Sequence, residues 1–130
     1  MLVARYFPDG IDIYFDNVGG KILDAVLPNM RFNGTIIECG MTSQYTLDKP
    51  EAIKNLENVV WKRLNIKAII VDYYYHLFPK LQNFIIPLMK EGKIVYMEDI
   101  DEGIESCPSA LVGLFHGSNL GRKIVAVARE

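Results

Sequence analysis

The sequence is poor in cysteine, in basic residues and in long apolar runs, and each shortage argues against a class of protein. Its two cysteines, Cys39 and Cys107, lie far apart with no metal-ligand spacing, which fits a reducing, cytoplasmic compartment better than a disulfide framework. Lys and Arg number 14 against 16 for Asp and Glu, so no basic excess is available to neutralise nucleic acid. No run reaches the roughly 18 apolar residues that a membrane span requires. We therefore expect neither a nucleic-acid nor a membrane partner.

A dinucleotide-binding fingerprint is also missing. No G-x-G-x-x-G run and no Walker lysine motif occurs among the ten glycines of the chain. The first predicted strand begins about ten residues into the sequence, and we expect no helix or strand before it. The sequence therefore reads as the second half of a mononucleotide-binding sheet without its first half.

The composition that remains is that of a globular domain. Half of the 130 residues are apolar and 23% are charged. A compact chain of this length buries roughly two-thirds of the surface that its unfolded state exposes, which is enough for a core. The length suits one domain or a substantial piece of a larger one.

Hydrophobic periodicity predicts a strand–helix–strand unit at the start. A period-2 pattern predicts a strand over residues 11–16, in which the apolar positions are Ile11, Ile13 and Phe15. Apolar residues three or four apart predict a helix over residues 21–30. The pair Asn33 and Gly34 then predicts a turn into a second strand over residues 35–39. Short links of this kind favour a parallel pair with a right-handed crossover.

The alternation continues along the chain. Helices are expected over residues 50–65, 79–91 and 108–115. Strands are expected over residues 67–72, 94–98 and 123–129. Alternating strands and helices predict an α/β fold with a parallel sheet.

Several long motifs, in order, resemble one family. They are residues 10–20 (GIDIYFDNVGG), 38–45 (ECGMTSQY), 71–79 (VDYYYHLFP), 91–94 (EGKI) and 110–121 (ALVGLFHGSNLG). The chain resembles the zinc-independent branch of the medium-chain dehydrogenase/reductase superfamily, and within it the plant NADPH-dependent 2-alkenal (double-bond) reductases. The likeness covers essentially all 130 positions.

The resemblance implies a fold and an activity. It implies a partial Rossmann-type parallel sheet, the C-terminal half of an NADP-binding domain over residues 1–93, and a tail over residues 94–130 that returns to the catalytic domain. Reductases of this kind transfer hydride from NADPH to the β-carbon of an α,β-unsaturated aldehyde or ketone. A proton then reaches the α-carbon.

The resemblance also implies site residues. Tyr45 would lie beside the nicotinamide and the substrate carbonyl and is the catalytic candidate, because a phenol can donate a hydrogen bond to an oxygen on which enolate charge develops. Whether it also gives the proton is left open. The implied cofactor-binding residues are Asn17, Cys39, Tyr45, Ile69, Ile70, Val71 and Asn119.

Each candidate also has an ordinary structural interpretation. Asn17 could belong to a turn that caps the following helix, and Cys39 could be a small buried apolar residue. Tyr45 could be a loop tyrosine packed at the surface. Residues 69–71 could be core side chains, and Asn119 could be a plain loop residue.

A zinc site is not expected, because His76 and His116 are forty residues apart without another ligand at a suitable spacing. The acidic cluster at residues 98–105 is expected to be a solvated face.

Two other functions remain as alternatives. The chain could be a truncated, non-catalytic fragment that acts at most as a dimerisation module, through the edge strand from Lys67 to Asp72. It could also be related to the quinone reductases of the same superfamily.

Overall fold

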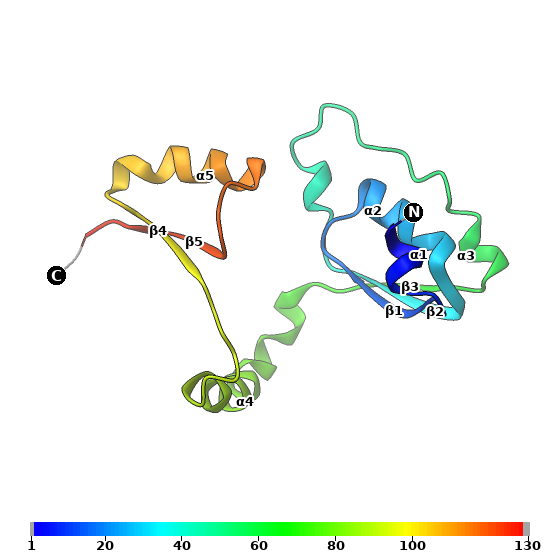
Figure 1. Cartoon of the computed structure of the whole chain (residues 1–130), viewed down its shortest axis with the longest axis horizontal. Helices are drawn as coiled ribbons and strands as arrows, with labels where there is room; N and C mark the ends of the chain where they lie inside the picture. Colours follow the sequence, from blue (N-terminus) through cyan, green and yellow to red (C-terminus); the bar gives the residue numbers. More distant parts are fainter. Residues whose placement is uncertain (1, 129–130) are drawn as a thin grey trace. The chain divides into compact units, whose positions relative to one another are not determined.

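The computed structural model describes residues 2–128, which divide into two compact units (Figure 1). The first unit ends at Tyr75 and the second begins at His76. The first contains the helices α1 (Leu2–Tyr6), α2 (Gly20–Val26) and α3 (Asn58–Trp61), and the strands β1 (Ile11–Asp16), β2 (Met30–Glu38) and β3 (Asn65–Ala68). The second contains α4 (Phe78–Lys90), β4 (Glu98–Glu102), α5 (Cys107–His116) and β5 (Arg122–Ala126). Short 3₁₀ helices lie at Leu27–Asn29, Thr42–Gln44, Val71–Leu77 and Ile104–Ser106.

The sheet of the first unit is parallel throughout, in the order β1–β2–β3. The first strand has the predicted bounds. The second is longer than predicted: it begins at Met30, which was expected at the end of the helix. Ile11 is opposite Met30 but Ile13 is opposite Thr35, so β2 carries extra residues at this point. Asn33, with a φ of 62°, lies in this irregularity, so the residue pair that predicted a turn instead forms a bulge within a strand.

The core of the first unit lies between this sheet and the helices beside it. Its buried residues are Ile11, Leu23, Val26, Leu27, Met30, Ile36 and Leu64. Val3 packs against this cluster from α1, a helix that the sequence analysis did not expect. The alternation predicted for β1 is wrong beyond Ile11: Ile13 and Phe15 are exposed, whereas Asp16 is completely buried. The apolar face of β1 is therefore open, and the strand ends on a buried carboxylate.

The helix predicted over residues 50–65 is wrong. Only residues 58–61 are helical, and the chain before them is irregular. Asn55 holds this segment to α2, because its backbone N–H donates to Asp24 Oδ1 at 2.7 Å and its Nδ2 donates to the Asp24 carbonyl at 3.0 Å. Ile53 and Val59 still reach the core. The apolar spacing thus marks some residues of the core without forming a continuous helix, and Leu56 and Val60 are exposed.

The second unit contains a second parallel pair, β4 and β5. Helices α4 and α5 confirm the two predicted helices, but the strand expected over residues 94–98 is wrong, since β4 begins at Glu98 and runs through the acidic cluster. Lys123 of β5 explains why this segment can form a strand: its Nζ lies 2.9 Å from Asp99 Oδ1 and 2.8 Å from Asp101 Oδ1. Opposite charges across paired strands stabilise the pair.

Candidate functional site

The carboxyl ends of the three strands in the first unit stop in register. The last residues of these strands are neighbours: Asp16, Glu38 and Ala68. The residues that follow them directly are three of the predicted cofactor contacts: Asn17, Cys39 and Ile69. Open α/β sheets bind ligands at this edge of the sheet. The register therefore brings candidates from distant parts of the sequence to one edge.

Asp16 organises the turn after β1, a role that the sequence pattern did not predict. Its Oδ1 accepts hydrogen bonds from the backbone N–H of Val18 at 2.8 Å and of Gly19 at 3.0 Å, and from the Tyr14 hydroxyl at 3.2 Å. Its backbone carbonyl accepts from the N–H of Cys39 at 2.8 Å. An acidic residue that ends an apolar strand just before a glycine pair was the available signal, but the period-2 pattern assigned Asp16 to an outer face.

The loop after β2 is attached to the turn after β1 at two adjacent carbonyls. Thr42 donates to the Asn17 carbonyl from its backbone N–H at 3.1 Å and from its hydroxyl at 3.0 Å. Ser43 donates to the Val18 carbonyl in the same way, at 3.1 and 2.6 Å. Four hydrogen bonds therefore fix this loop against the Asn17 turn.

Tyr45 lies at the end of this attached segment and is 66% exposed. Its hydroxyl oxygen accepts a hydrogen bond from the Met41 N–H at 3.3 Å. Within residues 2–128, no acceptor takes the Tyr45 hydroxyl proton. The ring is thus oriented by its own loop while the O–H donor stays available for a ligand.

The side chains of Asn17 and Cys39 are exposed at the same edge. Exposure of Cys39 argues against the buried apolar role. Helix α2 begins after Gly19 and no side chain caps it, so Asn17 is not its cap. Both side chains are free to meet a ligand.

The strand predicted over residues 67–72 is wrong: β3 spans Asn65–Ala68, and a 3₁₀ helix begins at Val71. Residues 69–71 follow β3. The Ile69 N–H donates to the Glu38 carbonyl at 2.9 Å and extends the ladder past the strand end. The side chains of Ile70 and Val71 are 56% and 58% exposed, so they are not core residues of the first unit.

Two carboxylates are buried beneath this edge. Among the residues that the structure describes, no hydrogen-bond donor reaches Asp16 Oδ2 or either oxygen of Glu38. Burial, and then the negative charge of Asp16, raise the pKa of Glu38 above its ordinary value of 4.5. Burial, followed by the charge of Asp16, also raises the pKa of Tyr14 to about 12. Glu38, at the end of β2, therefore holds its proton to a higher pH than an ordinary glutamate does.

The N-terminus of α2 is occupied by the chain itself. Glu51 accepts a hydrogen bond from the Lys21 N–H at 3.2 Å and forms an ion pair with the Lys21 side chain. Gln44 accepts from the Glu51 N–H at 2.7 Å and so holds Glu51 in place. Helix N-termini often bind phosphate, but this one carries an internal carboxylate. The site accordingly lacks a phosphate cradle at this position.

Asn119 belongs to the second unit, in the link between α5 and β5. Its Nδ2 donates to the Gly121 carbonyl at 2.6 Å, which closes a local turn. Asn119 therefore belongs to a different unit from the other candidate residues.

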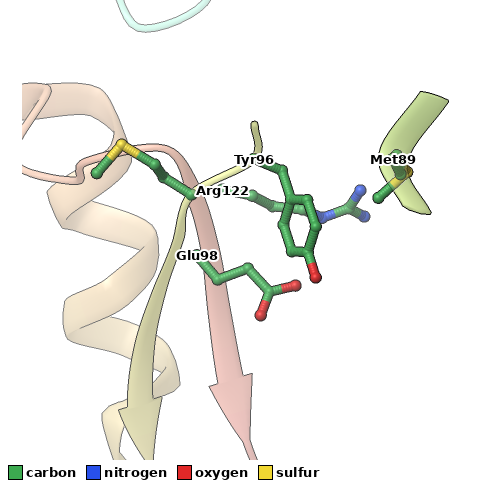
Figure 2. Close-up of a pocket in the computed structure, with 5 residues that line it drawn as sticks. Met89, Tyr96, Glu98 and Arg122 are labelled. Carbon is green, nitrogen blue, oxygen red and sulfur yellow. The ribbon is translucent and has the colours of Figure 1, made fainter. Parts of the chain in front are cut away.

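The second unit also has a pocket of about 360 Å³ (Figure 2). It is lined by Met89, Tyr96, Met97, Glu98 and Arg122, and none of these was a predicted site residue. Within the described part of the chain, no group of three or more His, Cys, Asp or Glu side chains is placed to hold a metal ion. None of the helices between residues 2 and 128 is long and apolar enough to cross a membrane.

Comparisons with known proteins show what the chain is similar to. No family model matches the chain. The (+)-pulegone reductase of Mentha piperita is 54% identical and the NADP(+)-dependent 2-alkenal reductase of Nicotiana tabacum is 56% identical, each over 128 residues and 98% of this chain. The crystal structure of CurA from Vibrio vulnificus in complex with NADPH has a TM-score of 0.84 at 32% identity, over 99% of this chain. Over nearly its whole length the chain is similar to reductases of the medium-chain dehydrogenase/reductase superfamily.

The match covers only part of each relative. The chain spans 37% of the length of both plant reductases and 40% of CurA. The predicted resemblance to the double-bond reductases of this superfamily is confirmed over nearly the whole chain. The predicted α/β fold with a partial Rossmann-type parallel sheet is confirmed as well.

Proposed function

We propose that this reductase segment supplies the nicotinamide side of an active site that reduces the C=C bond of α,β-unsaturated aldehydes and ketones. The observation that carries the proposal is the register of Asp16, Glu38 and Ala68, which places Asn17, Cys39 and Ile69 at one sheet edge. The two plant relatives, a pulegone reductase and a 2-alkenal reductase, support this substrate class.

The residues present suit one end of NADPH. Exposed polar groups and a free phenol O–H suit a nicotinamide ring and a substrate carbonyl. The α2 N-terminus suits the phosphates poorly, because Glu51 already occupies it. We therefore assign the phosphates to residues outside this chain and expect very weak NADPH binding by the 130 residues alone.

Tyr45 is the residue to which we assign the catalytic role. NADPH, when bound, supplies the hydride that the substrate β-carbon takes. Negative charge then develops on the carbonyl oxygen, and the free Tyr45 O–H can donate a hydrogen bond to it. A donor held in place before the reaction stabilises such charge without reorganisation, and the Met41 N–H provides this restraint.

The other assignments follow the sheet edge. We assign Asn17 and Cys39 to cofactor contacts at the ends of β1 and β2. Residues 69–71 contact the cofactor beyond β3, and Asn119 approaches it from the tail. We assign residues 1–93 to the nucleotide-binding domain and residues 94–130 to the tail of the catalytic domain.

We further propose a homodimer that pairs through the edge segment from Lys67 to Asp72, of which residues 67 and 68 belong to β3. Its support is that β3, at Asn65–Ala68, is an edge of the three-stranded sheet and that all four of its residues are exposed. Unpaired edge strands favour pairing with a second copy. Sedimentation showing only monomer at high concentration would exclude this pairing. A cytoplasmic location is supported by the two free cysteines.

A titration of ¹⁵N-labelled protein tests the nicotinamide assignment. Millimolar NADP⁺ and nicotinamide mononucleotide are expected to shift the amide signals of Asn17, Cys39 and Tyr45. Adenosine monophosphate, which lacks the nicotinamide, is expected to leave them unchanged. Equal shifts from adenosine monophosphate, or no shift with any ligand, would contradict the assignment.

An enzyme assay tests whether these 130 residues suffice for catalysis. We expect the 130-residue chain to show no measurable turnover with NADPH and a short 2-alkenal, and no micromolar NADPH affinity by fluorescence. Robust turnover would show that these residues suffice for catalysis. A Y45F variant then decides the role of the phenol: kcat should fall by about 10²-fold, the typical loss of one oriented donor, with little change in KM for NADPH.

A further inference from the structure

Asp16 is joined to both parts of the proposed site. It precedes Asn17 in the chain, and its carbonyl accepts hydrogen bonds from the N–H groups of Cys39 at 2.8 Å and Gly40 at 3.2 Å. Its side chain accepts hydrogen bonds from the N–H groups of Val18 and Gly19 in the turn. Asp16 thus contributes to the join between the end of β1 and the loop after β2, beside the bonds of Thr42 and Ser43 to Asn17 and Val18.

We propose that Asp16 is a positioning residue. Its side chain sets the Asn17 turn in its ligand-binding geometry, and the loop that carries Tyr45 follows, because Thr42 and Ser43 bond to the carbonyls of that turn. This inference rests on the proposed function, because it assigns Asp16 to the same site. Asp16 touches no ligand in this role. It acts through the backbone of the residues that do.

A helix cap would be the simpler role for such an aspartate, and the geometry argues against it. A capping side chain bonds to N–H groups inside the first turn of the helix. Asp16 instead bonds to Val18 and Gly19, which both precede the first residue of α2, Gly20. Its carboxylate therefore shapes the turn and leaves the helix terminus to Glu51.

The burial of Asp16 also points to a specific role. Its side chain is completely buried, and within residues 2–128 its Oδ2 has no hydrogen-bond partner. A buried carboxylate with an unpaired oxygen is destabilising, and an apolar residue at this strand end would avoid that cost. The carboxylate offsets part of this cost, because its Oδ1 accepts hydrogen bonds from the Val18 and Gly19 N–H groups of the turn.

Three variants test the inference. D16A removes the acceptor. D16N keeps an acceptor for the Val18 and Gly19 N–H groups and places an amide donor beside Glu38. D12N is the matched control, because Asp12 lies in the same strand but is exposed and pairs with Arg31.

Amide hydrogen exchange without ligand is the first readout. D16A should speed exchange at Val18 and Gly19, whose side-chain acceptor it removes, by about tenfold or more. Cys39 and Gly40, which donate to the Asp16 backbone carbonyl that alanine retains, and the ladder amides of β1 and β2 should stay protected. D16N and D12N should match the natural protein. Unchanged exchange in D16A, or loss of protection in D16N, would overturn the inference. If D16A fails to fold, D16N decides alone, because only a retained acceptor predicts normal protection.

The NADP⁺-induced amide shifts are the second readout. D16A should lose the shifts at Asn17 and Tyr45, and D16N should keep them. Shifts that persist in D16A despite fast exchange would show that Asp16 stabilises the turn without positioning the site. No shift in the natural protein would contradict the proposed function instead, so the two failures are distinguishable.

Discussion

The two units of the chain differ in what supports their polar residues. In the first, the strand ends rest on a buried core, and hydrogen bonds fix the turn after β1 to the loop after β2. In the second, Ala110 is the only buried apolar residue among those described, and α4 buries none. The candidate site with the most restraint therefore lies in the first unit.

The units also differ in how their carboxylates respond to pH. Glu38 in the first unit is buried beside Asp16, and both effects raise its pKa. Asp99 in the second accepts a hydrogen bond from Lys123, which lowers its pKa. Deprotonation of Glu38 opposes folding, whereas deprotonation of Asp99 favours it. In the first unit, burial and the nearby Asp16 thus disfavour the charged form of Glu38 beneath the candidate site. In the second unit, Lys123 forms ion pairs with Asp99 and Asp101.

The largest expected effect comes from the core of the first unit. L27A removes a completely buried side chain and should lower the free energy of unfolding by about 2–5 kcal/mol. L81A in α4, where the side chain is 52% exposed, should cost less than about 1 kcal/mol. Urea titrations that follow resolved amide signals of each unit measure both. Equal losses would remove the contrast between the units.

A smaller effect is expected at two glycines with positive φ. Gly20 has a φ of 55°, and an added Cβ would overlap the Gln44 amide that holds the loop. Gly92 has a φ of 69° and nothing within 4 Å of the added Cβ. G92A should cost about 1–2 kcal/mol from backbone strain alone, and G20A about 1 kcal/mol more from lost loop contacts.

Thermal unfolding of both variants measures the difference. Amide shifts in the loop at residues 42–45 should accompany G20A only. Equal costs for the two substitutions, with no shift in that loop, would show that the contact of Gly20 with the loop is unimportant.

The last prediction concerns pH. The folded-state pKa of Glu38 lies above the unfolded value of 4.5, so the folded protein binds more protons in the interval between them. Stability from this group is complete below pH 4.5 and falls as the pH rises through the raised pKa. E38Q should abolish this fall, and should be more stable than the natural protein at neutral pH.

Free energies of unfolding between pH 4 and pH 8 test this prediction. The control is E57Q, because Glu57 is an exposed carboxylate of the same unit. Parallel curves for the natural protein and E38Q would contradict the claim that the charged form of Glu38 destabilises the fold. A matching change in E57Q would assign the effect to net charge.

Sequence patterns predicted the elements that local chemistry determines. The bounds of the strand at residues 11–16 and of the helix near residues 79–91 were predicted well, because alternation, a starting proline and a terminal glycine act within a few residues. Which face of that strand is buried was not predicted beyond Ile11. The patterns failed where distant residues decide. Asn55 bonds to Asp24, so an apolar periodicity did not become a helix, and Lys123 makes a strand of an acidic segment.

In the candidate site too, local features could be predicted and features that depend on distant residues could not. Asn17 and Cys39 could be placed at strand ends from the sequence, because strand ends are local features. The burial of Asp16 could not, since it depends on which face of β1 the core covers. Glu51 at the α2 N-terminus was missed for a similar reason, because thirty residues separate it from Lys21.

The central claim is that the ends of β1 and β2 and the loop after β2 form one surface that faces the nicotinamide. The most direct test is an NOE experiment on deuterated protein with protonated tyrosine rings, in millimolar NADP⁺. The account predicts NOEs between the nicotinamide ring protons and a tyrosine ring that vanish in Y45F. NOEs that persist in Y45F, or that involve only the adenine protons, would contradict it.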